Sequence, residues 1–322
     1  MDIVEHKGDF LYILIQIVLL VVAFILLEKG SDWLVEGSSG LAKKFKVSDL
    51  FIGLTIVAFG TSAPELVVSV IGAIQHHGSI SIGNVVGSNM ANAALVLGSA
   101  IIVGNGMIIK KQTLHYEMPL MILAQLVATM MLLKDGYLDY HNGIVLLIFF
   151  VIFLAYAFLT SKNGFEEISV KQRSLSFYSL LTVIGMVSVT AGGEIGVYSA
   201  VNLARSFRVS ETLIATTIVA FGTSIPELAT SIKASSKSKE DLAVGNVIGS
   251  NLFNILAVLG IPSLLSPIKP DRSMKPDLIF MNATGIILLF LFLNRKYKAK
   301  KWKGLLLLSI YTSYIIYEIF AR

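Results

Sequence analysis

Two glutamates occur inside strongly apolar stretches of the chain, each within nearly the same run of residues. Glu65 belongs to "TIVAFGTSAPEL", which starts at Thr55, and Glu227 belongs to "TIVAFGTSIPEL", which starts at Thr217. No Lys, Arg or His lies within five residues of either glutamate. A lone carboxylate at the centre of a bilayer costs about 3 kcal/mol on insertion scales. If these stretches cross a membrane, mobile cations are the predicted compensation for both charges.

The residues before each glutamate predict a broken helix. Pro64 has no N–H for the carbonyl of Gly60 and disfavours helical geometry at Ala63. We therefore expect two half-helices, with free carbonyls near Ala58 and Thr61. Within a membrane such carbonyls must be buried in protein or line a cavity. The second copy repeats every step of this argument.

A second repeated block adds side-chain oxygens. It reads "GNVVGSNMANAALVLG" from Gly83 and "GNVIGSNLFNILAVLG" from Gly245. In each copy three polar side chains at spacing i, i+4 and i+8 share one helix face; they are Asn84, Ser88 and Asn92, and then Asn246, Ser250 and Asn254. Oxygen ligands without His or Cys suit Ca²⁺, Na⁺ or Mg²⁺, and mixed flexible ligation favours Ca²⁺ over Mg²⁺. Asn89 and Asn251 lie off this face and are interpreted as interhelical glue.

Other interpretations of these residues remain open. "SAPE" and "SIPE" both fit a capping box, in which Ser62 or Ser224 caps a helix and the glutamate satisfies its start. A cap can be neutral, so this role alone does not explain a charge within a membrane. Both serines can also serve as caps and ligands together. Asp32 and Glu194 are predicted near helix ends, facing water or capping a neighbour.

The elements that carry these residues are predicted to be membrane helices. Of the 322 residues, 55% are hydrophobic and 15% are charged, whereas soluble domains carry about 25% charge. Ten segments approach the ~20 residues that span a bilayer. Six are plain (11–27, 118–133, 143–160, 175–191, 278–293 and 304–320), and four are interrupted by Gly and polar residues (51–73, 80–103, 212–232 and 242–264). The first helix is expected to continue past Leu27 as a less apolar stretch. The absence of cysteine excludes disulfides, thiol catalysis and Cys-based metal sites.

The two halves of the chain are related by a fixed offset, so that adding 162 to a residue number in the first half gives its counterpart in the second. Segments 55–70 and 217–232 share 12 identities in 16, and segments 83–98 and 245–260 share 10 in 16. Each half holds five helices, and because five is odd the second half enters the membrane from the opposite side. The prediction is an all-α membrane protein of two inverted five-helix repeats, 1–160 and 175–322, joined by a cytoplasmic linker, 161–174. Transporters with this plan bind substrate near the midplane.

Basic residues predict the orientation. The loops on one side carry 17 Lys and Arg residues, and those on the side of the termini carry 8. Positive loops stay in the cytoplasm, so both termini are expected outside the cell membrane.

With both blocks present in both halves, the chain resembles the sodium/calcium exchangers of the cation/Ca²⁺ exchanger superfamily in their compact prokaryotic form. The resemblance implies that Glu65 and Glu227 coordinate Ca²⁺ and that Thr61 and Thr223 contribute to the Ca²⁺ and Na⁺ sites. It also implies flanking Na⁺ ligands at Ala58, Ser62, Ser88, Ala220, Ser224 and Ser250, and it suggests that the first and sixth helices slide over the remaining core.

One position departs from part of that family. Some archaeal and potassium-dependent relatives carry Asp at the position of Asn254, which here matches Asn92 in the first half. With only two carboxylates in the site, K⁺ co-transport is not expected, and Na⁺ coupling is favoured over proton coupling.

The resulting prediction is a secondary active antiporter that exchanges Ca²⁺ for Na⁺ by alternating access. It is not an enzyme, it needs no cofactor, and its partners are the transported ions and the lipid bilayer. No nucleic acid and no obligate protein partner are implied. A Ca²⁺/H⁺ antiporter is the alternative, and a cation channel is less favoured because the internal two-fold is complete within one chain.

Overall fold

The computed structural model describes residues 10–162, 173–207, 222–270, 274–293 and 297–321. Its elements are helices, interrupted in places by π-helical turns (η), and one two-stranded sheet. The first half consists of α1 (Phe10–Phe45), α2 (Asp49–Ile52), η1 (Gly53–Val57), α3 (Ala58–Thr61), α4 (Ala63–Ile74), α5 (Gly78–Met90), η2 (Ala91–Val96), α6 (Leu97–Val103), β1 (Met107–Ile108), η3 (Thr113–Glu117), α7 (Met118–Asp135) and α8 (Tyr140–Leu159). The second half consists of α9 (Leu175–Ser206), α12 (Ile225–Ser236), α13 (Glu240–Phe253), η5 (Asn254–Val258), α14 (Gly260–Leu265), α15 (Lys275–Phe292), β2 (Lys298–Ala299) and α16 (Lys301–Ala321).

The chain is an all-α multi-pass membrane protein, as the sequence predicts. Within the described residues eight helices are long and apolar enough to cross a membrane, and the bent pair 49–61 and 63–74 makes a ninth span. Residues 212–221 of the predicted segment 212–232 lie outside the described residues, as does most of the predicted linker 161–174.

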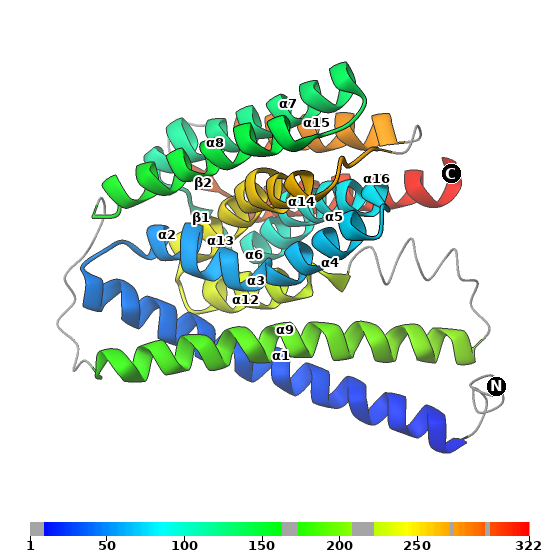
Figure 1. Ribbon diagram of the computed structural model, residues 1–322. Helices are drawn as coiled ribbons and strands as arrows, with labels where there is room; N and C mark the ends of the chain where they lie inside the picture. Colours follow the sequence, from blue (N-terminus) through cyan, green and yellow to red (C-terminus); the bar gives the residue numbers. More distant parts are fainter. Residues whose placement is uncertain (1–9, 163–172, 208–221, 271–273, 294–296, 322) are drawn as a thin grey trace.

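The helices are arranged in three groups (Figure 1). The long helices α1 and α9 lie side by side along one edge of the molecule, and α7, α8 and α15 lie along the opposite edge. Between them lie the helices that carry the repeated blocks. The spans differ in how far their most apolar 18 residues are buried. All of them are buried in Glu240–Leu265, 78% are buried in Gly78–Val103, and 11% are buried in α1. The polar blocks are therefore in the protein core, and α1 presents its apolar residues to lipid.

The first "GTSxPE" motif breaks its helix. α3 ends at Thr61, α4 begins at Ala63, and the two are bent by 48°. Only Ser62 departs from helical geometry, with φ −91° and ψ 10°. The predicted break is confirmed, and it is a sharp bend at one residue.

Two short β-bridges reflect the internal repeat. β1 pairs antiparallel with β2, and Leu138 forms an isolated bridge with Ile268. Adding 162 to Leu138 and subtracting it from Ile268 gives positions 300 and 106, which adjoin β2 and β1. Equivalent loops of the two halves are thus tied together twice.

Close helix packing in the core depends on Gly249. A Cβ atom there would lie 2.5 Å from the backbone oxygen of Leu54, and one at Gly245 would lie 2.7 Å from that of Leu50. Neither backbone oxygen can move like a side chain. We expect Gly249→Ala to destabilise the protein by about 1–3 kcal/mol, which is typical of overpacking. The measurement is the thermal unfolding midpoint of the purified protein in detergent.

The matched control for that variant is Gly196→Ala on α9. A Cβ there would meet only the Cβ of Ala23, at 3.5 Å, which is an ordinary contact. This variant should hold or raise the unfolding midpoint, because Ala is the better helix former. Equal midpoints for the two variants would contradict the close approach of α13 to η1.

Candidate cation site

Both glutamates lie in the first turn of a helix that begins at the motif. Glu65 is in α4 and Glu227 is in α12, and each is 0% exposed. The N-terminus of a helix carries a partial positive charge, which favours a carboxylate there. That contribution is about 0.3–1 kcal/mol at exposed sites, so it does not replace the solvation of two fully buried charges.

Hydrogen bonds join the two motifs into one cluster. Ser62 Oγ donates to Glu227 Oε1 at 2.9 Å, although the two residues belong to different halves of the chain. Ser88 Oγ lies 3.3 Å from Glu65 Oε1, to which it donates, and 3.2 Å from Thr223 Oγ1. Each carboxylate therefore contacts a hydroxyl of the repeated blocks, and residues of both halves make up a single site.

The capping interpretation of the serines is wrong for this structure. Ser62 and Ser224 occupy the N-cap positions of α4 and α12, but neither side chain accepts a capping hydrogen bond. Ser62 instead donates to Glu227. Its side chain therefore serves the carboxylate of the other half and not the start of its own helix.

Several buried oxygens of the cluster have no hydrogen-bond partner within the described part of the chain. They are Glu65 Oε2, Glu227 Oε2, Asn92 Oδ1, Ser224 Oγ, Ser250 Oγ and Asn254 Oδ1. All six side chains are 0% exposed. Leaving such an atom unmatched costs about 1–3 kcal/mol, and more for a charged group. A hard cation would satisfy several of them at once, so this donor set fits Ca²⁺ or Na⁺ as a transported substrate.

Two of the predicted ligands near the helix break, Ala58 and Thr61, already take part in hydrogen bonds. The backbone carbonyl of Ala58 accepts the N–H of Ser62 at 3.0 Å, so the prediction that it is free is wrong. Thr61 Oγ1 also lies 3.4 Å from this oxygen, a long contact that a cation bound to the second lone pair of the carbonyl would replace. Thr61 Oγ1 lies 3.2 Å from the backbone oxygen of Val57 and 3.1 Å from Asn246 Oδ1. Ala220 lies outside the described residues.

The two asparagines that end the polar faces lie at π-helical turns. Asn92 is in η2, which packs against α12, and Asn254 begins η5, which packs against α4. Each turn therefore packs against the glutamate helix of the other half. π-Helical turns within α-helices are frequent at functional sites. Both asparagines are 0% exposed, which keeps them among the candidate ligands.

An outer layer of polar side chains holds the cluster in place. Asn84 Nδ2 donates to the backbone oxygen of Glu65 and to Ser69 Oγ, both at 3.0 Å. Asn246 Nδ2 donates to Ser231 Oγ, also at 3.0 Å. Ser69 and Ser231 were not among the predicted site residues. The signal was present, since both are serines at equivalent positions of the two halves.

Asn89 and Asn251 bind each other's backbone. Asn89 Nδ2 donates to the backbone oxygen of Asn251 at 3.2 Å, and Asn251 Nδ2 donates to that of Asn89 at 3.4 Å. Asn254 Nδ2 also donates to Asn89 Oδ1, at 3.1 Å. The predicted role as glue between helices is confirmed.

The prediction that Asp32 and Glu194 lie near helix ends is wrong. Asp32 lies inside α1 and Glu194 lies inside α9. Asp32 forms ion pairs with Lys237 at 2.6 Å and with Lys233 at 3.4 Å, and Lys233 also reaches Glu28 at 3.3 Å. These contacts join α1 to α12.

Comparison with known proteins gives matches over nearly the whole chain. The family model described as sodium/calcium exchanger protein matches residues 15–159 and again residues 177–320. The chain is 37% identical to an uncharacterized membrane protein of Methanocaldococcus jannaschii, covering 89% of this chain and 92% of that protein. It is 34% identical to the Escherichia coli inner membrane protein YrbG, with 91% and 94% covered. Among solved structures, the sodium-calcium exchanger NCX_Mj soaked with 2.5 mM Na⁺ and 0.1 mM Ca²⁺ matches with a TM-score of 0.82 at 33% identity, covering 94% of this chain and 98% of that one.

Proposed function

Since this chain belongs to the sodium/calcium exchanger family, we propose that it is a secondary active antiporter that exchanges Ca²⁺ for Na⁺ by alternating access. The family consists of cation exchangers and not of enzymes. The observation that carries the choice of substrate is the shared cluster of Glu65 and Glu227, in which Ser62 and Ser88 bridge the two halves.

The charge of this cluster accounts for exchange. Two carboxylates carry −2, which one Ca²⁺ neutralises, and Na⁺ ions bound to the same glutamates would do likewise. An empty site leaves buried charge without compensation, which is costly in a medium of low dielectric constant. Reorientation is then favoured only when the site is loaded, and the two ions exchange in an obligatory way.

The proposed ligands form two overlapping sets, one for Ca²⁺ and one for Na⁺. Ca²⁺ is bound by Glu65 and Glu227 with help from Thr61 and Thr223. Na⁺ ions share the glutamates and use the flanking oxygens of Ala58, Ser62, Ser88, Asn92, Ala220, Ser224, Ser250 and Asn254. The predicted halves, 1–160 and 175–322, supply equivalent members of each set. The position of α1 and α9 along one edge of the bundle suits the proposal that these two helices slide over the rest (Figure 1).

We further propose that the protein resides in the cell membrane with both termini outside. The excess of Lys and Arg in the opposite loops supports this orientation. The E. coli relative is named an inner membrane protein, which agrees with residence in a cell membrane.

The test is uptake of ⁴⁵Ca²⁺ into proteoliposomes loaded with Na⁺, with K⁺ or with an acidic buffer. We expect an outward Na⁺ gradient to drive Ca²⁺ uptake without K⁺, because the site has Asn254 in place of a third carboxylate. Uptake from Na⁺-free vesicles under a pH gradient at the same rate would overturn the sodium assignment. Uptake without any counter-ion inside would indicate a channel.

A further inference from the structure

The two halves differ at a pair of equivalent positions, Asp32 and Glu194. Asp32 is neutralised by Lys233 of α12 and by Lys237, which directly follows the last residue of that helix. The counterparts of these two lysines in the first half are Ile71 and Gln75, which cannot pair with a carboxylate as cations do. Glu194 has no ion pair with any residue that the structure describes and is exposed. The same acidic position is therefore neutralised in one half and left charged in the other.

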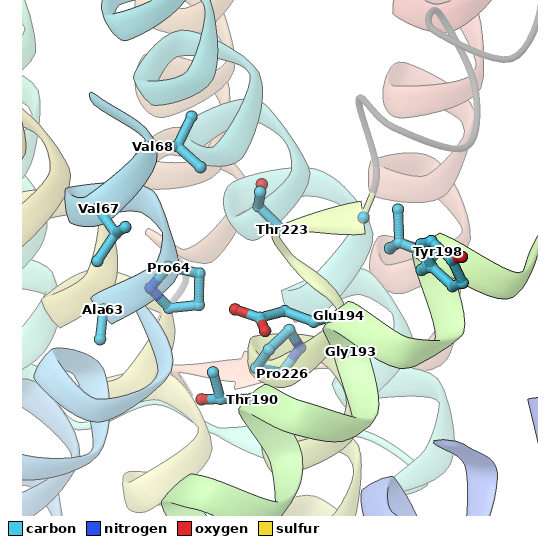
Figure 2. Close-up of a pocket in the computed structure, with 12 residues that line it drawn as sticks. Ala63, Pro64, Val67, Val68, Thr190, Gly193, Glu194, Tyr198, Thr223 and Pro226 are labelled. Carbon is cyan, nitrogen blue, oxygen red and sulfur yellow. The ribbon is translucent and has the colours of Figure 1, made fainter. Parts of the chain in front are cut away.

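Glu194 lines a pocket of about 420 Å³ between α4, α9 and α12. Its lining is mostly apolar and includes Pro64, Val67 and Pro226, whereas Thr190, Tyr198 and Thr223 contribute hydroxyls. Glu194 is the charged residue among the described ones that line it. In Figure 2 the Glu194 carboxylate extends from α9 toward Pro64. A space of this size holds on the order of ten water molecules, enough for a Ca²⁺ ion with its first shell of about 6–8 oxygens.

The inner wall of this pocket is part of the cation site. Pro64 and Pro226 directly precede Glu65 and Glu227. Thr223 Oγ1 lies 3.2 Å from Ser88 Oγ, which in turn donates to Glu65 Oε1. The pocket therefore borders residues that directly precede both glutamates or contact a ligand of Glu65.

We propose that Glu194 forms an outer recruitment site, which attracts hydrated Ca²⁺ and Na⁺ into this pocket before they reach Glu65 and Glu227. A carboxylate between walls of low dielectric constant focuses the electric field and raises the local concentration of cations. At the equivalent position of the other half, the lysines cancel the charge of Asp32 and tie α1 to α12. The site rests on the proposed exchange function, because the cations that it attracts are the transported ones.

The first test needs no transport and uses the absence of cysteine from the chain. Val197 lines the pocket one helical turn from Glu194. The variant Val197→Cys is treated with methanethiosulfonate reagents that carry either a trimethylammonium or a sulfonate group. We expect the cationic reagent to react faster than the anionic one. Glu194→Gln should lower the ratio of the two reaction rates about tenfold, because a charged cleft raises the local concentration of counter-ions by about tenfold or more. Glu36→Gln, which removes an exposed carboxylate of α1, should leave the ratio unchanged. No reaction with either reagent, or a ratio unaffected by Glu194→Gln, would overturn the proposal.

The second test measures Ca²⁺ uptake against Ca²⁺ concentration on the pocket side, in vesicles of known orientation. Glu194→Gln should raise the half-saturating Ca²⁺ concentration about tenfold, with the effect on that concentration and not on the maximal rate. Glu36→Gln should change neither quantity. A fall in maximal rate at an unchanged half-saturating concentration would contradict recruitment. If wild-type uptake does not follow the Na⁺ gradient, the Na⁺/Ca²⁺ assignment fails, whereas the labelling ratio still decides the role of Glu194.

Discussion

Glu65→Gln and Glu227→Gln are each expected to lower Ca²⁺ exchange at least about 100-fold while the protein still folds and inserts. Glutamine has nearly the shape of glutamate and can still accept the hydrogen bond of Ser62 or Ser88. A helix-capping role would survive this change at a loss of about 1 kcal/mol. A Ca²⁺ ion held by one carboxylate, in contrast, leaves a net charge of +1 in a buried site. The measurement is ⁴⁵Ca²⁺ uptake by reconstituted variants.

The chain offers a matched control for those variants in Glu117. It is also 0% exposed, but it lies in η3, where Glu117 Oε1 accepts hydrogen bonds from Gln112 and Tyr156, both at 2.8 Å. Glu117→Gln should keep Ca²⁺ exchange, because this glutamate is outside the cluster. In the absence of ions the two site variants should unfold at or above the wild-type temperature, since each removes a buried charge. Added Ca²⁺ should no longer raise their unfolding temperatures.

The second large effect is expected for Asn254→Asp. Asn254 Nδ2 donates to Asn89 Oδ1 at 3.1 Å, and both side chains are buried. An ionised carboxylate at position 254 would face that acceptor and add a third negative charge to the site. Repulsion by like charges and the unmatched acceptor both favour a protonated side chain, so proton binding enters the transport cycle. We expect Ca²⁺ exchange to be retained, with a rate that changes about tenfold more between pH 6 and pH 9 than the wild-type rate does.

The measurement is Na⁺-driven ⁴⁵Ca²⁺ uptake by both proteins across that pH range, followed by uptake from K⁺-loaded and acid-loaded vesicles. An unchanged pH profile together with an unchanged ion requirement in Asn254→Asp would exclude Asn254 from the site.

The sequence predicts the site glutamates and the helix break because both follow from local chemistry that the chain repeats. Pro64 cannot continue the helical hydrogen bonds whatever packs around it, and Glu65 cannot lie buried at low cost without a cation. The partners of Asp32 could not be predicted in the same way. Lys233 and Lys237 belong to the other half of the chain, and only the packing of α12 against α1 brings them to Asp32.

The prediction for Asp32 is wrong because α1 continues much further beyond its apolar segment than hydropathy indicates. The apolar segment of the sequence stops at Leu27, whereas the helix continues to Phe45. Its second part buries small and polar residues such as Gly37 and Ser38. The contact with α9 is close, since a Cβ atom added at Gly37 would lie 2.6 Å from the backbone nitrogen of Thr182. Small residues that allow close helix contact carry little hydropathy signal.

The fixed offset in the sequence predicts two equivalent halves. In this conformation the contacts of the two halves differ. Ser62 donates to Glu227, but the hydroxyl of its counterpart Ser224 has no hydrogen-bond partner among the described residues. A repeat in the sequence identifies which residues correspond. It cannot identify which of two equivalent residues makes a given hydrogen bond. In alternating access the two halves adopt different conformations, so equivalent residues have different contacts.

Equilibrium binding of ⁴⁵Ca²⁺ to the purified wild type, Glu65→Gln and Glu227→Gln tests most directly whether the two glutamates form one shared site. The shared site predicts one tightly bound Ca²⁺ per wild-type chain and loss of that ion in both variants alike. Two ions per wild-type chain, with one retained in each variant, would show two separate sites and contradict the account.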